Sequence, residues 1–212
     1  YFILKTGAQW RELPFYYGKW RSVHKRYESW CRKGIWGLVL KHFSKECDGE
    51  NIMIDATIIR AHPCAAGYKK DHGEQESLGR SVGGFTTKIH ALVDALGQGL
   101  NFILTPGQHH DVTQAESLIE GFSDAHILAD KGYDSSDFIH KIRKQGCIPV
   151  IPSRSNAKNP RDYDKHLYKE RHLVECFFNK IKHFRRVFSR FDKRASSFLG
   201  FLHYASIILW LR

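Results

Sequence analysis

Three acidic residues, far apart in the sequence, are candidates for chemistry. Asp55 interrupts the apolar segment 51–59, where a carboxylate is costly to bury unless it is paired or binds a metal ion. Asp130 ends the apolar segment 125–130, and ligand sites of open α/β sheets lie at such strand ends. With Glu175 they would form an all-oxygen site suited to Mg²⁺ or Mn²⁺. Two such ions can activate a water or a 3′-hydroxyl for attack on a phosphodiester.

Glu175 lies in a segment, 167–190, that we predict to be one long helix. At about 100° per residue its polar stripe and its apolar side separate clearly. The polar stripe contains Arg171, Glu175, Asn179, Lys182 and Arg186. Taken singly, each acid has a structural alternative: Asp55 as a satisfied buried carboxylate, Asp130 as a turn residue, and Glu175 as the partner of Arg171 in an i,i+4 surface pair.

The composition favours a polyanionic partner. The chain of 212 residues has a formal net charge of +11 with neutral histidines. Lys and Arg are in excess in residues 1–50 and 153–194, whereas residues 51–152 are slightly acidic. Basic segments on both sides of a metal-binding centre fit contacts to phosphates, so nucleic acid is the first candidate partner.

The elements that must position these acids can be predicted from hydrophobic periodicity. Residues 1–48 indicate a small helical module resembling a helix-turn-helix, and its tryptophans could equally be core residues of a helical cap. We predict strands at 51–59, 85–94, 99–104, 125–130 and 147–152, and helices at 111–122, 135–146, 167–190 and 196–211. Thr113 and Glu116 have the spacing of a capping box. Three antiparallel strands followed by parallel ones predict a ribonuclease H-like mixed α/β sheet in residues 49–212, flanked by helices.

At these residues the chain resembles a known family, the insertion-sequence transposases with an Asp-Asp-Glu triad. The signature Tyr-x2-Arg-x3-Glu-x6-Lys is met by Tyr168, Arg171, Glu175 and Lys182 at every spacing. Further segments resemble the family in the same order, from "TGAQWRELP" near the start to "FFNKIKHFRR" near the end. Val82, His172 and Cys176 depart from the family pattern.

The resemblance implies the roles of these residues. Asp55, Asp130 and Glu175 would be the catalytic ligands of Mg²⁺ or Mn²⁺, with two ions bound. The implied activity is binding of element ends, metal-dependent cutting of DNA, and strand transfer into a target, which is DNA transposition by recombination. Tyr168, Arg171 and Lys182 would position the DNA. We also expect DNA contacts from further basic residues: Arg80, Lys88, Arg185 and Arg186.

Two alternatives stay open. One is a metal-dependent nuclease that cuts without joining, and the other is an inactive or domesticated transposase that only binds DNA. The partner is double-stranded DNA in each case, with a homodimer expected where two ends are joined.

The cysteines, the C-terminal apolar segment and the start of the sequence bear on where the protein is found and on whether a segment precedes Tyr1. Five scattered cysteines favour a reducing compartment, and the apolar segment 196–211 is short for a membrane span. Together with the resemblance, they imply a cytoplasmic protein of a bacterial cell, associated with the nucleoid and not with a membrane. Because Tyr1 lies inside an apolar pattern, we expect an upstream segment to be missing, and the basic loop 153–165 to be mobile or to face DNA.

Overall fold

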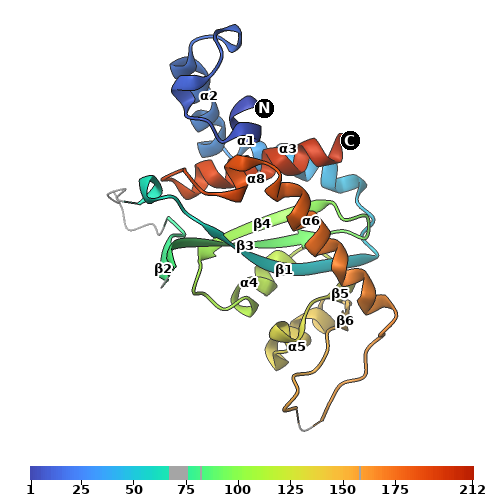
Figure 1. Ribbon diagram of the computed structural model, residues 1–212. Coiled ribbons are helices and arrows are strands. Elements are labelled where there is room, and N and C mark those ends of the chain that lie inside the picture. The colour runs from blue at the N-terminus through green and yellow to red at the C-terminus, as the bar shows by residue number, and fades with distance from the viewer. Residues whose placement is uncertain (67–75, 82, 158) are drawn as a thin grey trace.

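A six-stranded sheet forms the centre of the protein (Figure 1). The computed structural model describes residues 1–66, 76–81, 83–157 and 159–212, so Val82 lies outside the described residues. The strands are β1 (Asn51–Arg60), β2 (Gly79–Ser81), β3 (Gly84–Val93), β4 (Gly99–Pro106), β5 (His126–Leu128) and β6 (Ile148–Val150).

The pairing of the strands confirms the predicted ribonuclease H-like arrangement. β1 pairs antiparallel with β3 on one side and parallel with β5 on the other, and β6 extends the parallel half. β3 also pairs antiparallel with β4 and with β2. The five strands predicted from the sequence are present, and the three-residue β2 is an addition, too short to give a periodic signal.

Residues of β1 contribute to a separate core on each face of the sheet. Met53 and Ile59 belong to one apolar cluster, whereas Ile52 and Ile54 belong to the other. This division follows from the alternation of side chains along a strand. Asp55 has the parity of Met53 and therefore lies on the same face as that residue.

Helices cover both faces of the sheet, which gives three layers (Figure 1). On the face of Ile52 lie α4 (Val112–Leu118) and α5 (Ser136–Lys144). On the face of Met53 lie α6 (His172–Lys182), α7 (Arg185–Phe188) and α8 (Ala195–Trp210). Short 3₁₀ helices connect the larger elements: η1 (Trp10–Glu12), η2 (Phe15–Tyr17), η3 (Ser44–Glu46), η4 (Pro63–Ala65), η5 (Lys131–Tyr133) and η6 (Leu167–Arg171).

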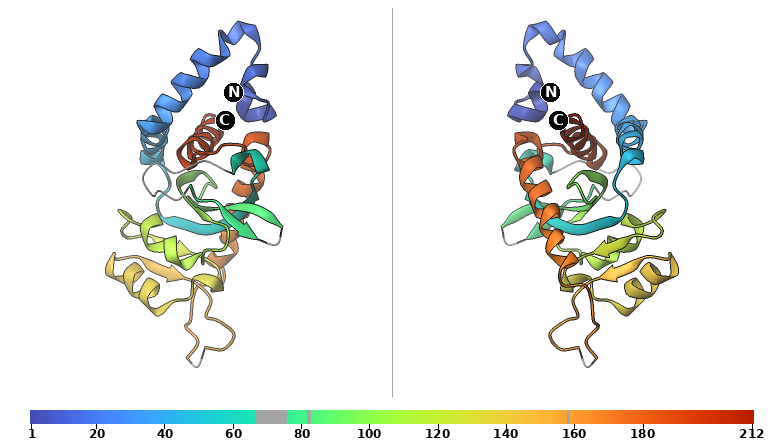
Figure 2. Two further views of the ribbon diagram at one scale, coloured as in Figure 1. Left: turned by 90° about the vertical axis from the view of Figure 1, so that its left-hand side faces the viewer. Right: turned by 90° about the vertical axis from the view of Figure 1, so that its right-hand side faces the viewer.

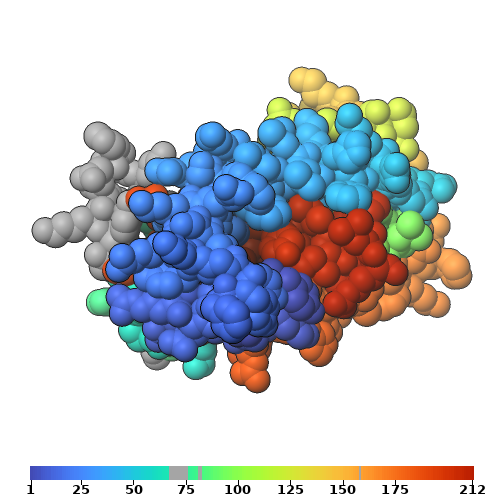
Figure 3. Space-filling model, turned by 90° about the horizontal axis from the view of Figure 1, so that it is seen from above, coloured from blue at the N-terminus to red at the C-terminus, as the bar shows by residue number. Residues whose placement is uncertain are grey.

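The N-terminal helices pack against α7 and α8, as the side views of Figure 2 and the view from above in Figure 3 show. They are α1 (Phe2–Thr6), α2 (Trp20–Arg32) and α3 (Ile35–Phe43). The Tyr27 ring stacks on Phe201 at 4.5 Å between centroids, and the Tyr27 hydroxyl donates a hydrogen bond of 2.7 Å to the carbonyl of Ser197. Residues 1–48 therefore share a core with the end of the chain.

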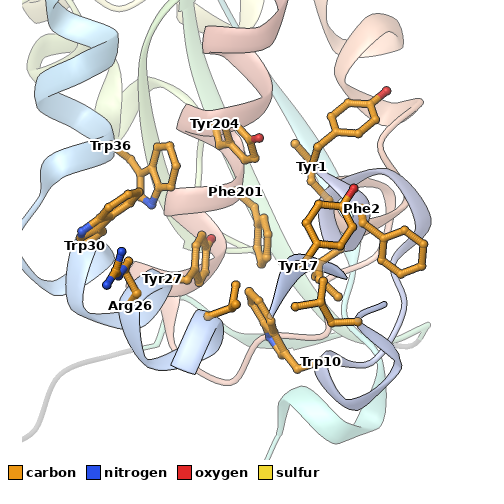
Figure 4. Close-up of a pocket in the computed structure, with 14 residues that line it drawn as sticks. Tyr1, Phe2, Trp10, Tyr17, Arg26, Tyr27, Trp30, Trp36, Phe201 and Tyr204 are labelled. Atoms are coloured by element: carbon orange, nitrogen blue, oxygen red, sulfur yellow. The ribbon is translucent and has the colours of Figure 1, made fainter. Parts of the chain in front are cut away.

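An aromatic cavity of about 230 Å³ lies at this junction. Trp10 and Tyr27 line it from the N-terminal helices, and Phe201 and Tyr204 line it from α8 (Figure 4). Trp10 also contacts both Tyr27 and Phe201 through their rings. Trp10 and Trp36 thus serve as packing residues, as the alternative of a helical cap predicts.

The segment predicted as one helix at 167–190 is three elements: η6, α6 and α7. Phe184 is extended, with φ −83° and ψ 109°, and it separates α6 from α7. Its ring is only 2% exposed, so the turn of the chain serves burial of this side chain. No glycine or proline marks the break in the sequence, and its cause is tertiary packing.

The start of α4 and the C-terminal helix are also predicted from the sequence. The capping box is wrong, because Asp111 is the N-cap of α4 and the Thr113 hydroxyl donates to the carbonyl of His110 at 2.6 Å. The C-terminal helix is confirmed as a buried element, α8. In the described part of the chain, no helix combines the length and the apolar character that crossing a bilayer requires.

Candidate active site

Asp55 lies in the middle of β1, opposite Ala91 of β3. Its side chain is 20% exposed. The Oδ1 atom accepts a hydrogen bond of 2.8 Å from the backbone N–H of Ala56, and Oδ2 accepts one of 3.2 Å from Arg171. The carboxylate is therefore held by one backbone group and one cation.

Asp130 follows β5 and begins η5. Its Oδ1 atom accepts a hydrogen bond of 2.8 Å from the backbone N–H of Gly132. A Cβ atom at position 132 would lie 2.9 Å from that same oxygen, so a side chain there would displace the Asp130 carboxylate. Asp130 thus caps the turn with one oxygen and keeps the other free of that bond.

Parallel pairing brings Asp55 and Asp130 to one place on the sheet. Met53 of β1 is paired with Leu128 of β5, and each aspartate follows its paired residue by two positions. Met53 and Leu128 belong to the same apolar cluster, and Asp130 is still extended, with φ −76° and ψ 173°. Both aspartates therefore lie on the face of the sheet that α6 covers, at the same edge.

Glu175 comes to this edge from the first turn of α6. Its side chain is 54% exposed and accepts a short hydrogen bond from Arg171. Further along α6, the Lys182 ammonium donates a hydrogen bond of 2.9 Å to the hydroxyl of Thr57, two residues beyond Asp55. Arg171, directly before α6, and Lys182, its last residue, thereby tie this helix to β1 at both of its ends.

The charges at this edge affect one another. Burial raises the pKa of Asp55, and the neighbouring carboxylates of Asp130 and Glu175 raise it further, while the Ala56 N–H and Arg171 oppose the rise. Burial works to lower the pKa of Arg171, but Asp55 and Glu175 outweigh it and raise that pKa. Burial also raises the pKa of Tyr168, which lies against Arg171 and senses Asp130. These five residues form one electrostatic unit.

The three carboxylates fit a hard divalent cation in their chemistry, because all their donor atoms are oxygens. Their present placement is less complete. Among residues 1–66, 76–81, 83–157 and 159–212, no three His, Cys, Asp or Glu side chains are placed to hold one ion together. The Arg171 guanidinium instead bonds to both Asp55 and Glu175. This guanidinium therefore occupies oxygen atoms that a metal ion would use.

The structure places the expected DNA-contacting residues in different surroundings. Arg80 and Arg185 are exposed, and the Arg80 guanidinium lies 5.2 Å from the ring centre of Phe85. Lys88 has the parity of Leu92 and so lies on the opposite face from Asp55, with its ammonium 2.6 Å from Asp111.

Arg186 is not part of the exposed polar stripe. It is 6% exposed and donates two hydrogen bonds, of 3.1 and 2.8 Å, to the carboxylate of Asp192. The break at Phe184 rotates Arg186 away from the side of α6 that carries Glu175. In this structure Arg186 is a buried ion-pair residue and faces no open surface for a phosphate.

A groove of about 740 Å³ beside Asp130 adds basic residues that the sequence analysis did not single out. Lys131 and Arg154 line it, together with His110 and Asn156. The Arg154 backbone N–H donates a hydrogen bond of 2.7 Å to the Asp134 carboxylate, and the Arg161 side chain forms an ion pair with the same carboxylate. The basic composition of loop 153–165 was the signal that pointed to this region.

Comparisons with known proteins agree with the resemblance. The family model "Transposase DDE domain" matches residues 47–210, and the model "Putative transposase of IS4/5 family" matches residues 1–40. A Brucella ovis protein named "Putative transposase for insertion sequence element IS6501" is 43% identical over 132 residues, which cover 60% of this chain and 99% of that protein. A Burkholderia cepacia protein named "Putative transposase for insertion sequence element IS402" is 34% identical over 128 residues, covering 55% of this chain and 58% of that protein.

Solved structures give weaker similarities. A pre-cleavage Mos1 transpososome is 11% identical, with a TM-score of 0.35 over 99% of this chain and 76% of that chain. A piggyBac transposase synaptic complex with hairpin DNA is 17% identical, with a TM-score of 0.34 over 52% of this chain and 24% of that chain. Because the family model matches residues 47–210, most of the sequence, the chain belongs to the transposase DDE domain family.

Proposed function

We propose that this chain catalyses cleavage and strand transfer of DNA for an insertion sequence, with Asp55, Asp130 and Glu175 as its catalytic residues. One observation carries the assignment. Asp55 of β1 and Asp130, just past the end of β5, each follow a member of the Met53–Leu128 pair by two positions, on the face where α6 presents Glu175. A separate structural role for each acid does not account for the shared face and the electrostatic interaction with a helix-borne glutamate.

The carboxylates would hold two Mg²⁺ or Mn²⁺ ions, which stabilise charge on the attacking and leaving oxygens of a phosphodiester. The protein itself positions the reactants. The Gly132 N–H and the Ala56 N–H orient Asp130 and Asp55. Lys131 and Arg154 flank Asp130 and would hold a phosphate in the adjoining groove. A water serves as nucleophile for cleavage, and a 3′-hydroxyl for joining.

Double-stranded DNA is the proposed partner, both as element ends with terminal inverted repeats and as target. Residues 1–48 would contribute to binding, since exposed basic side chains lie in η1, at the start of α2 and along α2. Arg11, Lys19, Arg21, Lys25 and Arg26 are exposed there. Because two element ends must be joined, the protein would act as a homodimer in the synaptic complex. It would act in the cytoplasm, at the nucleoid.

The test is a strand-transfer assay with Mg²⁺ or Mn²⁺ on DNA that carries the element's ends. Joined products that Asp55→Ala, Asp130→Ala and Glu175→Ala each abolish support the proposal. Cleavage without joining would make the protein a nuclease, and metal-independent binding without cleavage would make it a DNA-binding protein only. Strand transfer that survives Glu175→Gln contradicts the assignment of the third ligand.

A further inference from the structure

Arg171 connects two of the three candidate metal ligands through one side chain. It stands at the end of η6, directly before α6, and its side chain is 19% exposed. One terminal nitrogen, Nη1, donates to Asp55, and the other, Nη2, donates to Glu175. The guanidinium therefore satisfies a strand residue and a helix residue that lie 120 positions apart (175 − 55).

This contact differs from an ordinary surface pair. An exposed i,i+4 pair between Arg171 and Glu175 would contribute only a few tenths of a kcal/mol. Asp55, however, is mostly buried, and the charges of Asp130 and Glu175 act against its ionised form. Arg171 is the cation that lies between Asp55 and Glu175, and its two hydrogen bonds hold these carboxylates close together.

A divalent ion would need the same oxygen atoms. Asp55 Oδ2 and Glu175 Oε1 are the atoms that Arg171 contacts, and Asp55 Oδ1 already accepts the N–H of Ala56. A guanidinium and a metal ion compete for this position, because they use the same ligand atoms and repel each other. The two arrangements are thus alternatives of one site.

The natural acceptor for a displaced guanidinium is a phosphate, which matches its fork of donors. We propose that Arg171 is an exchangeable counter-ion: it pairs with Asp55 and Glu175 in the free protein and moves to a DNA phosphate when substrate binds, which releases both carboxylates for divalent ions. This inference rests on the proposed function. Arg171 is then a positioning residue that couples the two binding events.

The coupling has a reciprocal consequence. If DNA removes Arg171 from the carboxylates, DNA must tighten metal binding, and metal must tighten DNA binding by the same factor. Coupling between two sites typically amounts to a factor of about 5 to 150. Replacing Arg171 by a neutral residue of similar length should release the carboxylates without DNA and reproduce the tightening.

The experiment measures Mn²⁺ binding by the electron paramagnetic resonance of free Mn²⁺, on the whole chain. Only binding that Asp55→Asn removes is counted, with and without a short duplex of arbitrary sequence. We expect Arg171→Gln to bind Mn²⁺ at least about fivefold more tightly than the unaltered protein. The duplex should tighten Mn²⁺ binding to the unaltered protein and should leave the Mn²⁺ affinity of Arg171→Gln unchanged.

Two further variants make the result specific. Lys180→Gln removes the same charge from an exposed position of α6 and should bind Mn²⁺ like the unaltered protein. Arg171→Lys keeps the charge but lacks the planar group of donors that spans both carboxylates. Its Mn²⁺ affinity should therefore fall between those of Arg171→Gln and the unaltered protein. Circular dichroism verifies that each variant is folded, and Arg171→Lys provides the comparison if Arg171→Gln is not.

The outcomes separate this inference from the proposed function. Equal Mn²⁺ affinity of Arg171→Gln and the unaltered protein, at a site that needs Asp55, overturns the counter-ion role and leaves the metal site intact. A lack of any Asp55-dependent Mn²⁺ binding in all variants, with or without duplex, overturns the metal site itself and the counter-ion role with it.

Discussion

Asp55 and Asp130 each lie two residues beyond a member of the Met53–Leu128 pair, Asp55 within β1 and Asp130 just past the end of β5. Because strands alternate their side chains, this register sets both carboxylates on one face, and because the strands are parallel, it sets them at one edge. The backbone of the sheet therefore fixes their relative position, and local turns only adjust the direction of each carboxylate.

Gly132 is the clearest point at which that adjustment can be tested. Gly132→Ala would place a methyl group 2.9 Å from Asp130 Oδ1 and push the carboxylate out of its turn. We expect strand transfer to fall by about a hundredfold, since a displacement of about 1 Å at a catalytic group has an effect of that size. Thermal unfolding should change little, because Gly132 is exposed. The control is Gly49→Ala, where the added methyl group meets no atom within 4 Å; wild-type activity of Gly132→Ala would contradict the assigned role of Asp130.

Much of this arrangement is predictable from sequence because it depends on local periodicity. The apolar run around Asp55 predicts β1, and alternation along it predicts that Asp55 shares a face with Met53, as the structure confirms. The order of strands and helices then restricts the topology to few choices, and the ribonuclease H-like one is observed.

Other features depend on partners distant in the sequence and give no local signal. The break at Phe184 has no glycine or proline, and it arises where burial of that ring competes with continuation of the helix. Arg186 appears on a polar stripe until the break turns it toward Asp192. The bond from Arg171 to Asp55 likewise requires the packing of α6 across β1, which periodicity within either element cannot reveal.

Arg185 and Arg186 are adjacent in sequence but should respond differently to substitution. Arg186→Gln leaves Asp192 buried without its partner, and breaking a buried ion pair typically costs about 3 to 5 kcal/mol of unfolding free energy. Arg185 is exposed, so Arg185→Gln should leave stability unchanged within about 0.5 kcal/mol and weaken DNA binding. Urea unfolding and DNA binding at several salt concentrations measure the two effects. Equal stability of the two variants would mean that the pair with Asp192 contributes nothing.

His90 should make the protein sensitive to acid. It is fully buried, its Nε2 lies 2.8 Å from the Thr105 hydroxyl, and burial lowers its pKa to about 4, although Asp111 opposes this. Folding therefore favours the neutral ring. The resulting stability is fully present above the unfolded pKa of 6.5 and is lost as the pH falls toward 4, by about 3 kcal/mol at most.

His90→Gln should remove this dependence, because Gln does not titrate and can still bond to Thr105. The unfolding free energy, measured in urea between pH 7 and pH 4, should then decline less steeply than in the unaltered protein, with a remaining contribution from His203. His140→Gln, at an exposed position, is the control and should retain the original slope. A slope that is the same in all three proteins would show that His90 is protonated equally in the folded and unfolded states.

The close approach of α2 to α8 depends on Gly200. A Cβ atom there would lie 2.5 Å from the Cys31 sulfur and 3.0 Å from the Tyr27 hydroxyl. Gly200→Ala should therefore lower the unfolding free energy by about 1 to 3 kcal/mol, the usual cost of overpacking, and weaken DNA binding if residues 1–48 hold DNA in a fixed position. Cys31→Ala removes the nearest atom, so the double variant Gly200→Ala with Cys31→Ala should recover part of that loss. Urea unfolding of the four proteins gives the coupling between the two positions, and strictly additive effects would show that α2 and α8 do not meet at this contact.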